Sequence, residues 1–147
     1  MPDLRLRVIA PGDAAAVSVL AAQLGYSRTA AQILDWIETL RCDPRPQCAF
    51  VACMGAEVVG WIDVSIERHL QSAPYALIGG LVVQDGQRGG GIGRALCQRA
   101  EEWAWEQGVE TVRVTSRSSR ADAHRFYLRD GYSQIKTSLV FEKPRPR

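Results

Sequence analysis

The chain has 147 residues, 46% of them hydrophobic and 23% charged, and its 18 basic and 16 acidic side chains leave a formal net charge of +2. A chain of this length is expected to fold as one domain that buries a core without disulfides or metals. So small a net charge disfavours nucleic-acid binding through phosphate contacts, and the longest nearly uncharged apolar stretch, residues 73–83, is too short to span a membrane.

The cysteine and histidine pattern argues against a metal centre. No two cysteines form a C-x-x-C pair, and the two histidines lie far apart in the sequence. These residues are Cys42, Cys48, Cys53, Cys97, His69 and His124. Residues 1–5 also lack the basic start and apolar stretch of a signal peptide. We therefore expect a cytoplasmic protein with reduced thiols, no bound metal and no membrane partner.

The N-terminal part of the chain predicts one strand followed by two helices. Apolar and basic residues alternate across residues 4–8, which is typical of a strand. Asp13 is placed to cap a helix that Gly25 ends. Thr29 and Gln32 have the spacing of a capping box ahead of a second amphipathic helix.

Three strands are predicted next. Residues 50–53 and 58–66 form a hairpin around Gly55. Residues 75–83 predict a third strand, which is interrupted by two glycines at positions 79–80. Adjacent glycines inside a strand indicate a bulge, or a close approach of another group to the backbone.

The second half of the chain predicts a long helix and then a shorter one, each followed by a strand. The long helix covers residues 91–107 and is followed by a strand at 112–114. Ser119 and Asp122 have capping-box spacing for the last helix, and residues 132–141 predict a final strand.

The order of these elements, βααβββαβαβ, predicts the α+β class. We expect one domain, residues 1–142, with a central mixed, twisted sheet of six or seven strands and helices on both faces. The basic tail, residues 143–147, is expected to be disordered, because its alternate prolines disrupt both helices and strands.

The most informative segment runs from strand residues 81–83 through a glycine-rich turn into the long helix. The first amide N–H groups of a helix have no internal partner and lie at the positive end of its dipole, so they bind anions. Glycines let a polyphosphate approach those amides, and Arg88 and Arg94 could neutralise its oxygens. A P-loop is excluded because Arg94-Ala95 stands where it has Lys-Ser or Lys-Thr, and the spacing does not match a dinucleotide-binding fingerprint. The segment predicts a pyrophosphate site, although a flexible connector could carry the same glycines.

At these residues the chain resembles the GNAT acetyltransferase superfamily. Residues 88–93 (Arg-Gly-Gly-Gly-Ile-Gly) match its signature, Arg/Gln-x-x-Gly-x-Gly/Ala, at every position. Residues 123–132 (Ala-x-x-Phe-Tyr-x-x-x-Gly-Tyr) are similar to the family's closing motif, and residues 122–132 resemble the corresponding helix of aminoalkylphosphonate acetyltransferases. The predicted order of elements is also the family's order, so the resemblance spans nearly the whole chain.

The resemblance implies that acetyl-coenzyme A (acetyl-CoA) binds between two central parallel strands that splay apart, with residues 79–83 on one side and residues 112–114 on the other. It implies direct attack of an amine on the thioester, with no covalent enzyme intermediate. The backbone N–H of Val83 would polarise the thioester carbonyl, and Tyr127 would donate a proton to the departing sulfur. Without the resemblance, Tyr127 would be interpreted as a packing residue. The implied coenzyme-binding residues are Leu81, Val82, Val83, Arg88, Gly89, Gly90, Gly91, Ile92, Gly93, Arg94 and Arg120.

The chain departs from the family at two positions. Leu77 stands where many relatives have a glutamate that serves as the base, and Arg120 stands where relatives often have an asparagine near the coenzyme. Glu67 and His69, at the end of the preceding strand and in the loop after it, are the remaining candidates for the base, acting through water. Each could equally be an ordinary solvated residue. Arg120 could instead contact a phosphate or the pantetheine arm.

The sequence leaves the acceptor open. A small primary amine is the first expectation and a protein N-terminus or lysine the second, because the small net charge gives no sign of a basic protein substrate. A non-catalytic acyl-CoA-binding module would keep the glycine-rich segment without needing Tyr127. A nucleotide-binding regulator is a third interpretation. Relatives in this family often pair, so a homodimer is among the expectations.

Overall fold

The structure, a computed structural model, describes residues 3–87 and 89–147. The expected role of Arg88 in the phosphate site therefore lies outside the described residues. The chain forms two compact units, Met1–Thr115 and Ser116–Arg147, and each is described by itself.

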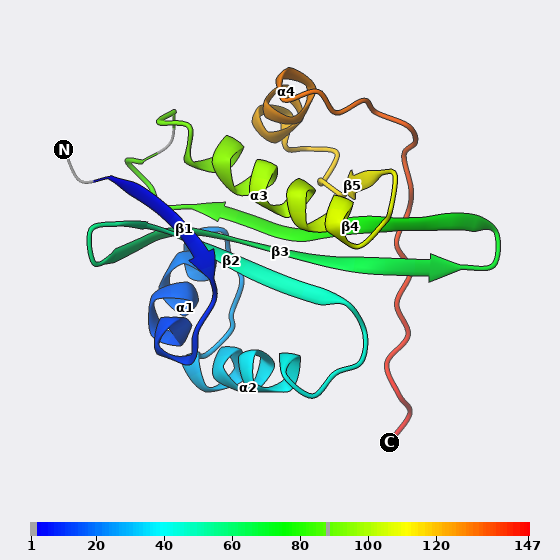
Figure 1. Ribbon diagram of the computed structural model, residues 1–147. Coiled ribbons are helices and arrows are strands. Elements are labelled where there is room, and N and C mark those ends of the chain that lie inside the picture. The colour runs from blue at the N-terminus through cyan, green and yellow to red at the C-terminus, as the bar shows by residue number, and fades with distance from the viewer. Residues whose placement is uncertain (1–2, 88) are drawn as a thin grey trace. The chain divides into compact units, whose positions relative to one another are not determined.

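A mixed sheet of five strands forms the centre of the first unit (Figure 1). Its strands lie side by side in sequence order, and all neighbours are antiparallel except the last pair, which is parallel. They are β1 (Leu4–Val8), β2 (Gln47–Met54), β3 (Glu57–His69), β4 (Ser72–Val83) and β5 (Val112–Val114). β3 and β4 are longer than predicted, so the loop expected at residues 67–74 is a tight turn at residues 70–71.

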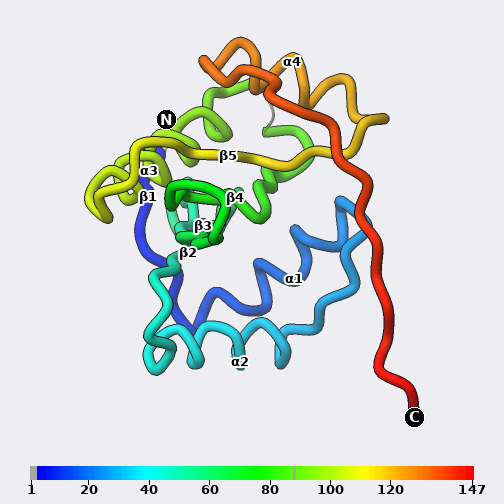
Figure 2. The backbone as a smooth tube through the Cα atoms, turned by 90° about the vertical axis from the view of Figure 1, so that its right-hand side faces the viewer, coloured from blue at the N-terminus to red at the C-terminus, as the bar shows by residue number. Residues whose placement is uncertain are grey.

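Helices cover both faces of this sheet, as predicted (Figures 1 and 2). The 3-10 turn η1 (Pro11–Asp13), α1 (Ala14–Gln23) and α2 (Ala30–Leu40) lie on one face, and α3 (Ile92–Glu106) lies on the other. The core therefore has two layers. The layer under α1 and α2 includes Val17, Ile33, Ile37, Ala49 and Val51. On the α3 side, Phe50, Ile62, Ile78 and Leu96 are almost fully buried.

Local sequence signals set several helix ends of the first unit. Thr29 Oγ1 accepts a hydrogen bond from the Gln32 N–H at 3.1 Å, and Gln32 Oε1 accepts one from the Thr29 N–H at 3.0 Å. This confirms the capping box of α2. Gly25 and Gly108 follow α1 and α3 with φ of 85° and 87°, the left-handed conformation that ends many helices.

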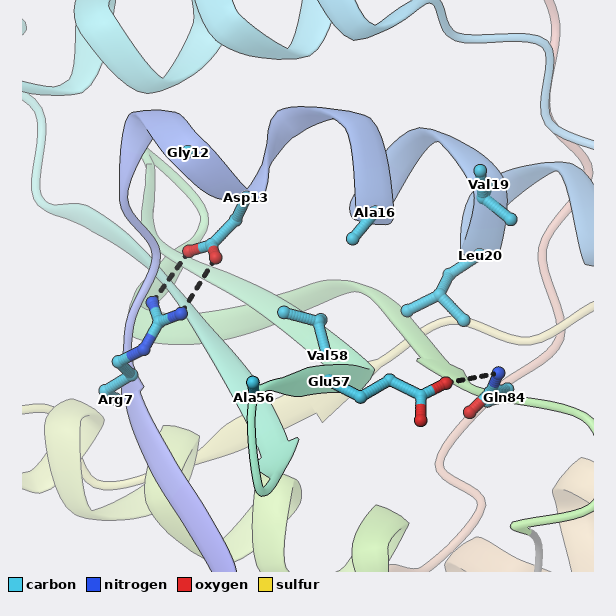
Figure 3. A pocket seen from close by; sticks show the side chains of 10 residues that line it. All are labelled: Arg7, Gly12, Asp13, Ala16, Val19, Leu20, Ala56, Glu57, Val58 and Gln84. Carbon is cyan, nitrogen blue, oxygen red and sulfur yellow. Dashed lines mark hydrogen bonds and ion pairs between the residues drawn. The ribbon is translucent and has the colours of Figure 1, made fainter.

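The predicted cap of α1 is wrong. Asp13 stands at the N-cap position, but its side chain makes no capping hydrogen bond to α1. Its carboxylate instead accepts two hydrogen bonds from Arg7, at 2.7 and 2.8 Å (Figure 3). It accepts a third from the Ala10 N–H at 2.8 Å. The bidentate contact with Arg7 holds the pKa of the Asp13 carboxyl below its usual range. Two charge-assisted hydrogen bonds from Arg7 stabilise the Asp13 carboxylate more than one capping hydrogen bond would, so the side chain binds Arg7 instead of capping α1.

We expect Arg7→Met to lower the free energy of unfolding by about 1–2 kcal/mol at pH 7, because Asp13 is buried and would lose its counter-charge. The Arg7 side chain is 47% exposed, and solvent screening keeps the loss at this modest size. Because the folded-state pKa of Asp13 is lowered, the contribution of the pair is complete above the ordinary pKa of 3.8. It disappears as the pH falls through the lowered value.

Urea unfolding at pH 7 and at about pH 3 checks this expectation, and the difference between the Arg7 variant and the parent chain should shrink at the lower pH. Arg5→Met is the matched control, since Arg5 is exposed on the same strand and donates a hydrogen bond to a turn carbonyl, that of Gly55, at 3.3 Å. An equal loss in both variants would show that the ion pair does not carry the effect.

The second unit contains one described helix, α4 (Ala121–Arg129). The capping box expected from Ser119 and Asp122 does not form, because α4 begins after Arg120 and its N-cap makes no side-chain hydrogen bond. Residues 132–147 form neither helix nor strand, so the predicted strand at 132–141 is wrong.

The sheet of the described residues accordingly has five strands, not the six or seven predicted. A strand persists only where its N–H and C=O groups find a ladder partner. The apolar side chains that suggested the last strand are exposed here: Ile135, Leu139, Val140 and Phe141. None of the described helices is both long enough and apolar enough to cross a membrane.

Candidate active site

The parallel pairing of β4 and β5 stops early and leaves part of β4 with a free edge. Beyond residue 78, β4 continues to Val83 and pairs with β3 on one side, but with no described strand on the other. The paired residues are Ala76 with Val112, Leu77 with Arg113, and Ile78 with Val114. The two strands thus separate beyond residue 78, and residues 112–114, which were expected to lie across the gap from residues 79–83, pair with residues 76–78 instead. Residues 79–83 of β4 form what we call the free edge.

The free edge presents main-chain groups in a defined direction. The Gln84 N–H donates to the Val59 carbonyl of β3 at 2.8 Å. Successive residues of a strand direct their N–H and C=O groups to opposite edges. The N–H groups of Val83 and Leu81 therefore point away from β3, toward the free edge. This agrees with an extended ligand pairing there as an additional strand.

The glycine-rich turn and the start of α3 follow the free edge in the chain. Gly89 and Gly91 have φ of 87° and 84°, and Gly91 is the N-cap of α3. As a glycine, this N-cap residue has no side chain with which to cap the helix. The first amides of a 15-residue helix, those of Ile92, Gly93 and Arg94, have no intrahelical partner. An uncapped N-terminus with positive-φ glycines before it is suited to an anion.

Gly79 is the extra residue of a bulge in β4. Asp63 pairs with Gly80 and Val64 pairs with Ile78, so Gly79 lies between two ladder positions. A Cβ built on Gly79 would lie 2.8 Å from Asp63 Oδ2, and one built on Gly80 would lie 2.9 Å from Cη2 of Trp61. The bulge and the close approach of other groups, both expected from the sequence, are therefore confirmed.

Asp63 is a half-buried carboxyl group in the middle of β3. Burial raises its pKa from an ordinary value of 3.8 to about 6, and hydrogen bonds from the backbone of Gly80 and of Asp63 itself oppose the shift only in part. Within the described residues, no charged side chain contributes to this shift. Buried groups with perturbed pKa values concentrate at functional sites.

Glu67 and His69, the two bases suggested by the sequence, lie at the far end of the β3–β4 hairpin. Glu67 accepts a hydrogen bond from Ser65 Oγ at 3.2 Å, and His69 Nε2 lies 3.8 Å from Glu67 Oε2. The His69 ring stacks on the Tyr75 ring with 5.9 Å between centroids, and the Arg113 guanidinium lies over the Tyr75 ring, 4.0 Å from its centroid.

The hairpin end is separate from the free edge. Glu67 pairs with Tyr75, which precedes the segment where β4 and β5 are still joined. Four residues along a strand span about 13 Å, so Glu67 is distant from Asp63 and the bulge. Glu67 and His69 therefore gather with each other and not with the free edge.

Tyr127 and Arg120 belong to the second unit. Arg120 is the N-cap residue of α4, and Tyr127 lies on its half-buried side. The Tyr127 ring makes edge-to-face contacts with Phe126 and Tyr132, at centroid distances of 5.3 and 5.7 Å. Ala123, Phe126 and Tyr127 are half-buried and lie along one side of α4, which we call the helix stripe. The proton-donating role of Tyr127 stays a prediction.

A pocket of about 380 Å³ lies beside η1, α1 and the turn between β2 and β3 (Figure 3). Its polar side chains pair with one another: Arg7 with Asp13, and Gln84 Nε2 with Glu57 Oε1 at 3.1 Å. It contains none of the residues predicted for the site. In the described parts of the chain, no three metal-ligating side chains gather into a group that could hold an ion.

The comparison with family models decides the family. Residues 16–132 match the model described as the acetyltransferase (GNAT) family. The chain belongs to the GNAT acetyltransferase family. The matched range includes the free edge of β4, the start of α3 and all of α4.

Individual relatives of this GNAT chain extend the comparison. An aminoalkylphosphonate N-acetyltransferase from Salmonella typhimurium is 42% identical over 85 residues, which is 57% of this chain and 55% of that protein. The match thus spans about half the length of this relative. A crystal structure of a transcriptional regulator from Bacillus halodurans C-125 is 26% identical, with a TM-score of 0.83, and covers 96% of this chain and 100% of that one.

A third comparison supports the fold alone. The aminoglycoside N-acetyltransferase AAC(6′)-Iy in complex with CoA has a TM-score of 0.85 with this GNAT chain at 16% identity. The similarity covers 97% of this chain and 96% of that one.

Asp63 is the residue of this GNAT chain that sequence reasoning missed. The signal was present, because Asp63 alternates with Trp61 and Ser65 on one strand face, and a Gly-Gly pair follows on the next strand. What the sequence did not reveal was that the carboxylate and the two glycines lie against each other.

Proposed function

We propose that this GNAT chain transfers the acetyl group of acetyl-CoA to the primary amine of a small molecule. The observation that carries the proposal is the free edge of β4, whose main-chain groups lead into the uncapped N-terminus of α3. The free edge suits the extended, amide-containing arm of acetyl-CoA, and the N-terminus of α3 suits the diphosphate of the same molecule.

The first unit can hold such a donor through main-chain groups, because no residue of the free edge has a charged side chain. The amides of Ile92 to Arg94, with the turn at Gly89–Gly91, would hold the diphosphate. The main chain of Leu81 and Val83 would pair with the pantetheine arm, and one of these two N–H groups would polarise the thioester carbonyl.

The chemistry is acyl transfer by direct attack. A neutral amine attacks the thioester carbon, the C–N bond forms and the C–S bond breaks. Tyr127 is proposed to give a proton to the departing sulfur, a role that rests on the motif around it. No step needs a nucleophilic cysteine, and Cys97 is fully buried in the core.

The acceptor class is supported by the aminoalkylphosphonate N-acetyltransferase described above. Its name gives aminoalkylphosphonates as the acceptors of that protein, and such acceptors are small molecules that carry a primary amine. Acetylation of a protein N-terminus or lysine is the second candidate. A non-catalytic acyl-CoA-binding module is the rival from another class.

One experiment separates these functions. Calorimetry measures CoA binding, and free-thiol release is followed with acetyl-CoA and a panel of primary amines. Binding with turnover supports the enzyme, whereas binding without turnover on small amines or on peptides supports the binding module. Protection from heat by ATP or NAD, but not by acetyl-CoA, would point to a nucleotide-binding regulator instead.

We expect Gly91→Ala to weaken CoA binding by about tenfold or more, because a side chain in the left-handed region costs about 1–2 kcal/mol and the turn would relax away from the amides. Gly108→Ala is the matched control at the other end of the same helix. Gly91 and Gly108 have φ of 84° and 87°, and both have open space where a Cβ would stand. Both variants should lose similar stability, and only Gly91→Ala should lose affinity. Equal affinity in the two variants would show that the start of α3 does not bind the donor.

A further inference from the structure

The site holds a carboxylate that the acetyltransferase chemistry has not yet used. Asp63 lies on β3 directly opposite Gly80, at the start of the free edge. The structure gives it no ion-pair partner in residues 3–87 and 89–147, although it is half-buried. A buried carboxylate without a counter-ion is costly, so its retention in a core strand calls for an explanation.

The backbone is shaped around this carboxylate. Ideal Cβ atoms on Gly79 and Gly80 would lie 2.8 and 3.2 Å from its oxygens, closer than side-chain carbons normally approach. The bulge at Gly79 thus provides the space into which Asp63 extends. Trp61, two residues earlier on the same face, closes one side of this space against Gly80.

The residues closest to Asp63 on the neighbouring elements are uncharged. β2 opposes it with Ala49, and β4 opposes it with Gly80. The buried residues of α1 and α2 on this side of the sheet are aliphatic: Ala14, Val17, Leu20, Ala21, Ile33 and Ile37. Along β3 the next side chain on the same face is Ser65, followed by the carboxylate Glu67. No residue of α1, α2, β2 or β4 is cationic, and Arg68 and His69 of β3 lie at the far end of the hairpin, so a cationic ligand would supply the positive charge.

We propose that Asp63 binds the ammonium group of the acceptor and takes the proton that its nitrogen must lose before it attacks. This inference rests on the proposed function and deepens it by naming the base. The ammonium R–NH₃⁺ gives one proton to the Asp63 carboxylate and becomes R–NH₂, which attacks the thioester carbon. The second proton leaves the nitrogen for water as the C–S bond breaks, and the sulfur takes its proton from Tyr127.

The position of Asp63 also selects between the two backbone donors of the free edge. Leu81 adjoins Gly80, whereas Val83 is three residues, about 10 Å, along the strand. A proton acceptor acts within hydrogen-bond reach, or through one water. The Leu81 N–H is therefore the donor that stabilises the oxyanion, in place of Val83.

The test compares Asp63→Asn, which keeps the size of the side chain, with Asp35→Asn, an equal charge change on the exposed side of α2. The readouts are the CoA Kd, and kcat/KM from pH 5 to 9 with a primary amine that the parent chain acetylates. We expect Asp63→Asn to keep its CoA Kd within about twofold and to lose about 100-fold or more in kcat/KM. The acid limb of the parent profile near pH 6 should vanish in Asp63→Asn and stay in Asp35→Asn.

Each outcome decides the matter. An Asp63→Asn variant that loses clearly less than about 100-fold in kcat/KM, or that keeps its acid limb, overturns the inference and leaves the acetyltransferase standing. An acid limb that disappears in Glu67→Gln also overturns it. A parent chain that neither binds CoA nor acetylates any amine overturns the proposed function and this inference together. Should Asp63→Asn not fold, Asp63→Ser, which also removes the carboxylate but fills less space, replaces it in the test and should lower kcat/KM by the same factor.

Discussion

Tyr127→Phe should lower kcat by about 100-fold while the Kd for CoA changes by less than about twofold. The variant keeps the ring that packs edge-to-face on Phe126 and Tyr132, so the fold of α4 should persist. It removes only the phenol hydroxyl, which under the proposal donates a proton to the departing sulfur. Steady-state thiol release and calorimetry on the same preparation measure the two quantities.

Tyr132→Phe is the matched control for this prediction. Tyr132 loses the same hydroxyl from the same aromatic cluster, with the ring contact to Tyr127 retained. It should keep kcat within about threefold of the parent chain. If Tyr127→Phe turns over as fast as Tyr132→Phe, Tyr127 packs in the helix stripe and does not act as the acid.

The second large effect concerns stability. The free energy of unfolding of Asp63→Asn is compared with that of the parent chain at two pH values. The difference, variant minus parent, should be about 2–3 kcal/mol more positive at pH 8 than at pH 4. Burial raises the folded-state pKa of Asp63 to about 6, above its ordinary value of 3.8. The folded state therefore binds this proton more tightly than the unfolded state does. The associated stability is complete below pH 3.8 and is lost as the pH rises through 6, and asparagine carries no such charge.

Urea unfolding of both proteins at pH 4 and pH 8 measures the difference. Other titrating groups, including Asp13 with its lowered pKa, act equally in the two proteins and cancel. Parallel stability curves would mean that Asp63 is solvated in the folded protein. In that case the charged Asp63 carboxylate would cost the folded protein no stability, and ammonium binding would not be needed to explain why it is retained.

The order of the elements was predictable from the sequence because local patterns determine them. The capping box at Thr29 and the glycine after α3 act within a few residues, and the structure confirms both. The double glycine in β4 indicated a bulge for the same local reason. The family resemblance placed residues 79–83 beside a gap, but it did not predict that residues 112–114 pair with residues 76–78.

The errors came from interactions between distant residues. Asp13 has the sequence context of a helix cap, but a bidentate contact with Arg7 on the preceding strand outweighs that role. The strand predicted at residues 132–141 required a ladder partner, which a hydrophobic pattern alone does not provide. Asp63 could be placed on a strand face, but its burial against a bulge on another strand depends on tertiary packing.

The early end of the β4–β5 ladder has an evolutionary consequence. A donor recognised through peptide groups meets atoms that every amino-acid type shares, so drift in the side chains of Leu81 and Val83 would cost it little. Acceptor preference, in contrast, would rest on a few side chains such as Trp61. Descendants of such a scaffold can therefore exchange one acceptor for another while the donor requirement stays fixed.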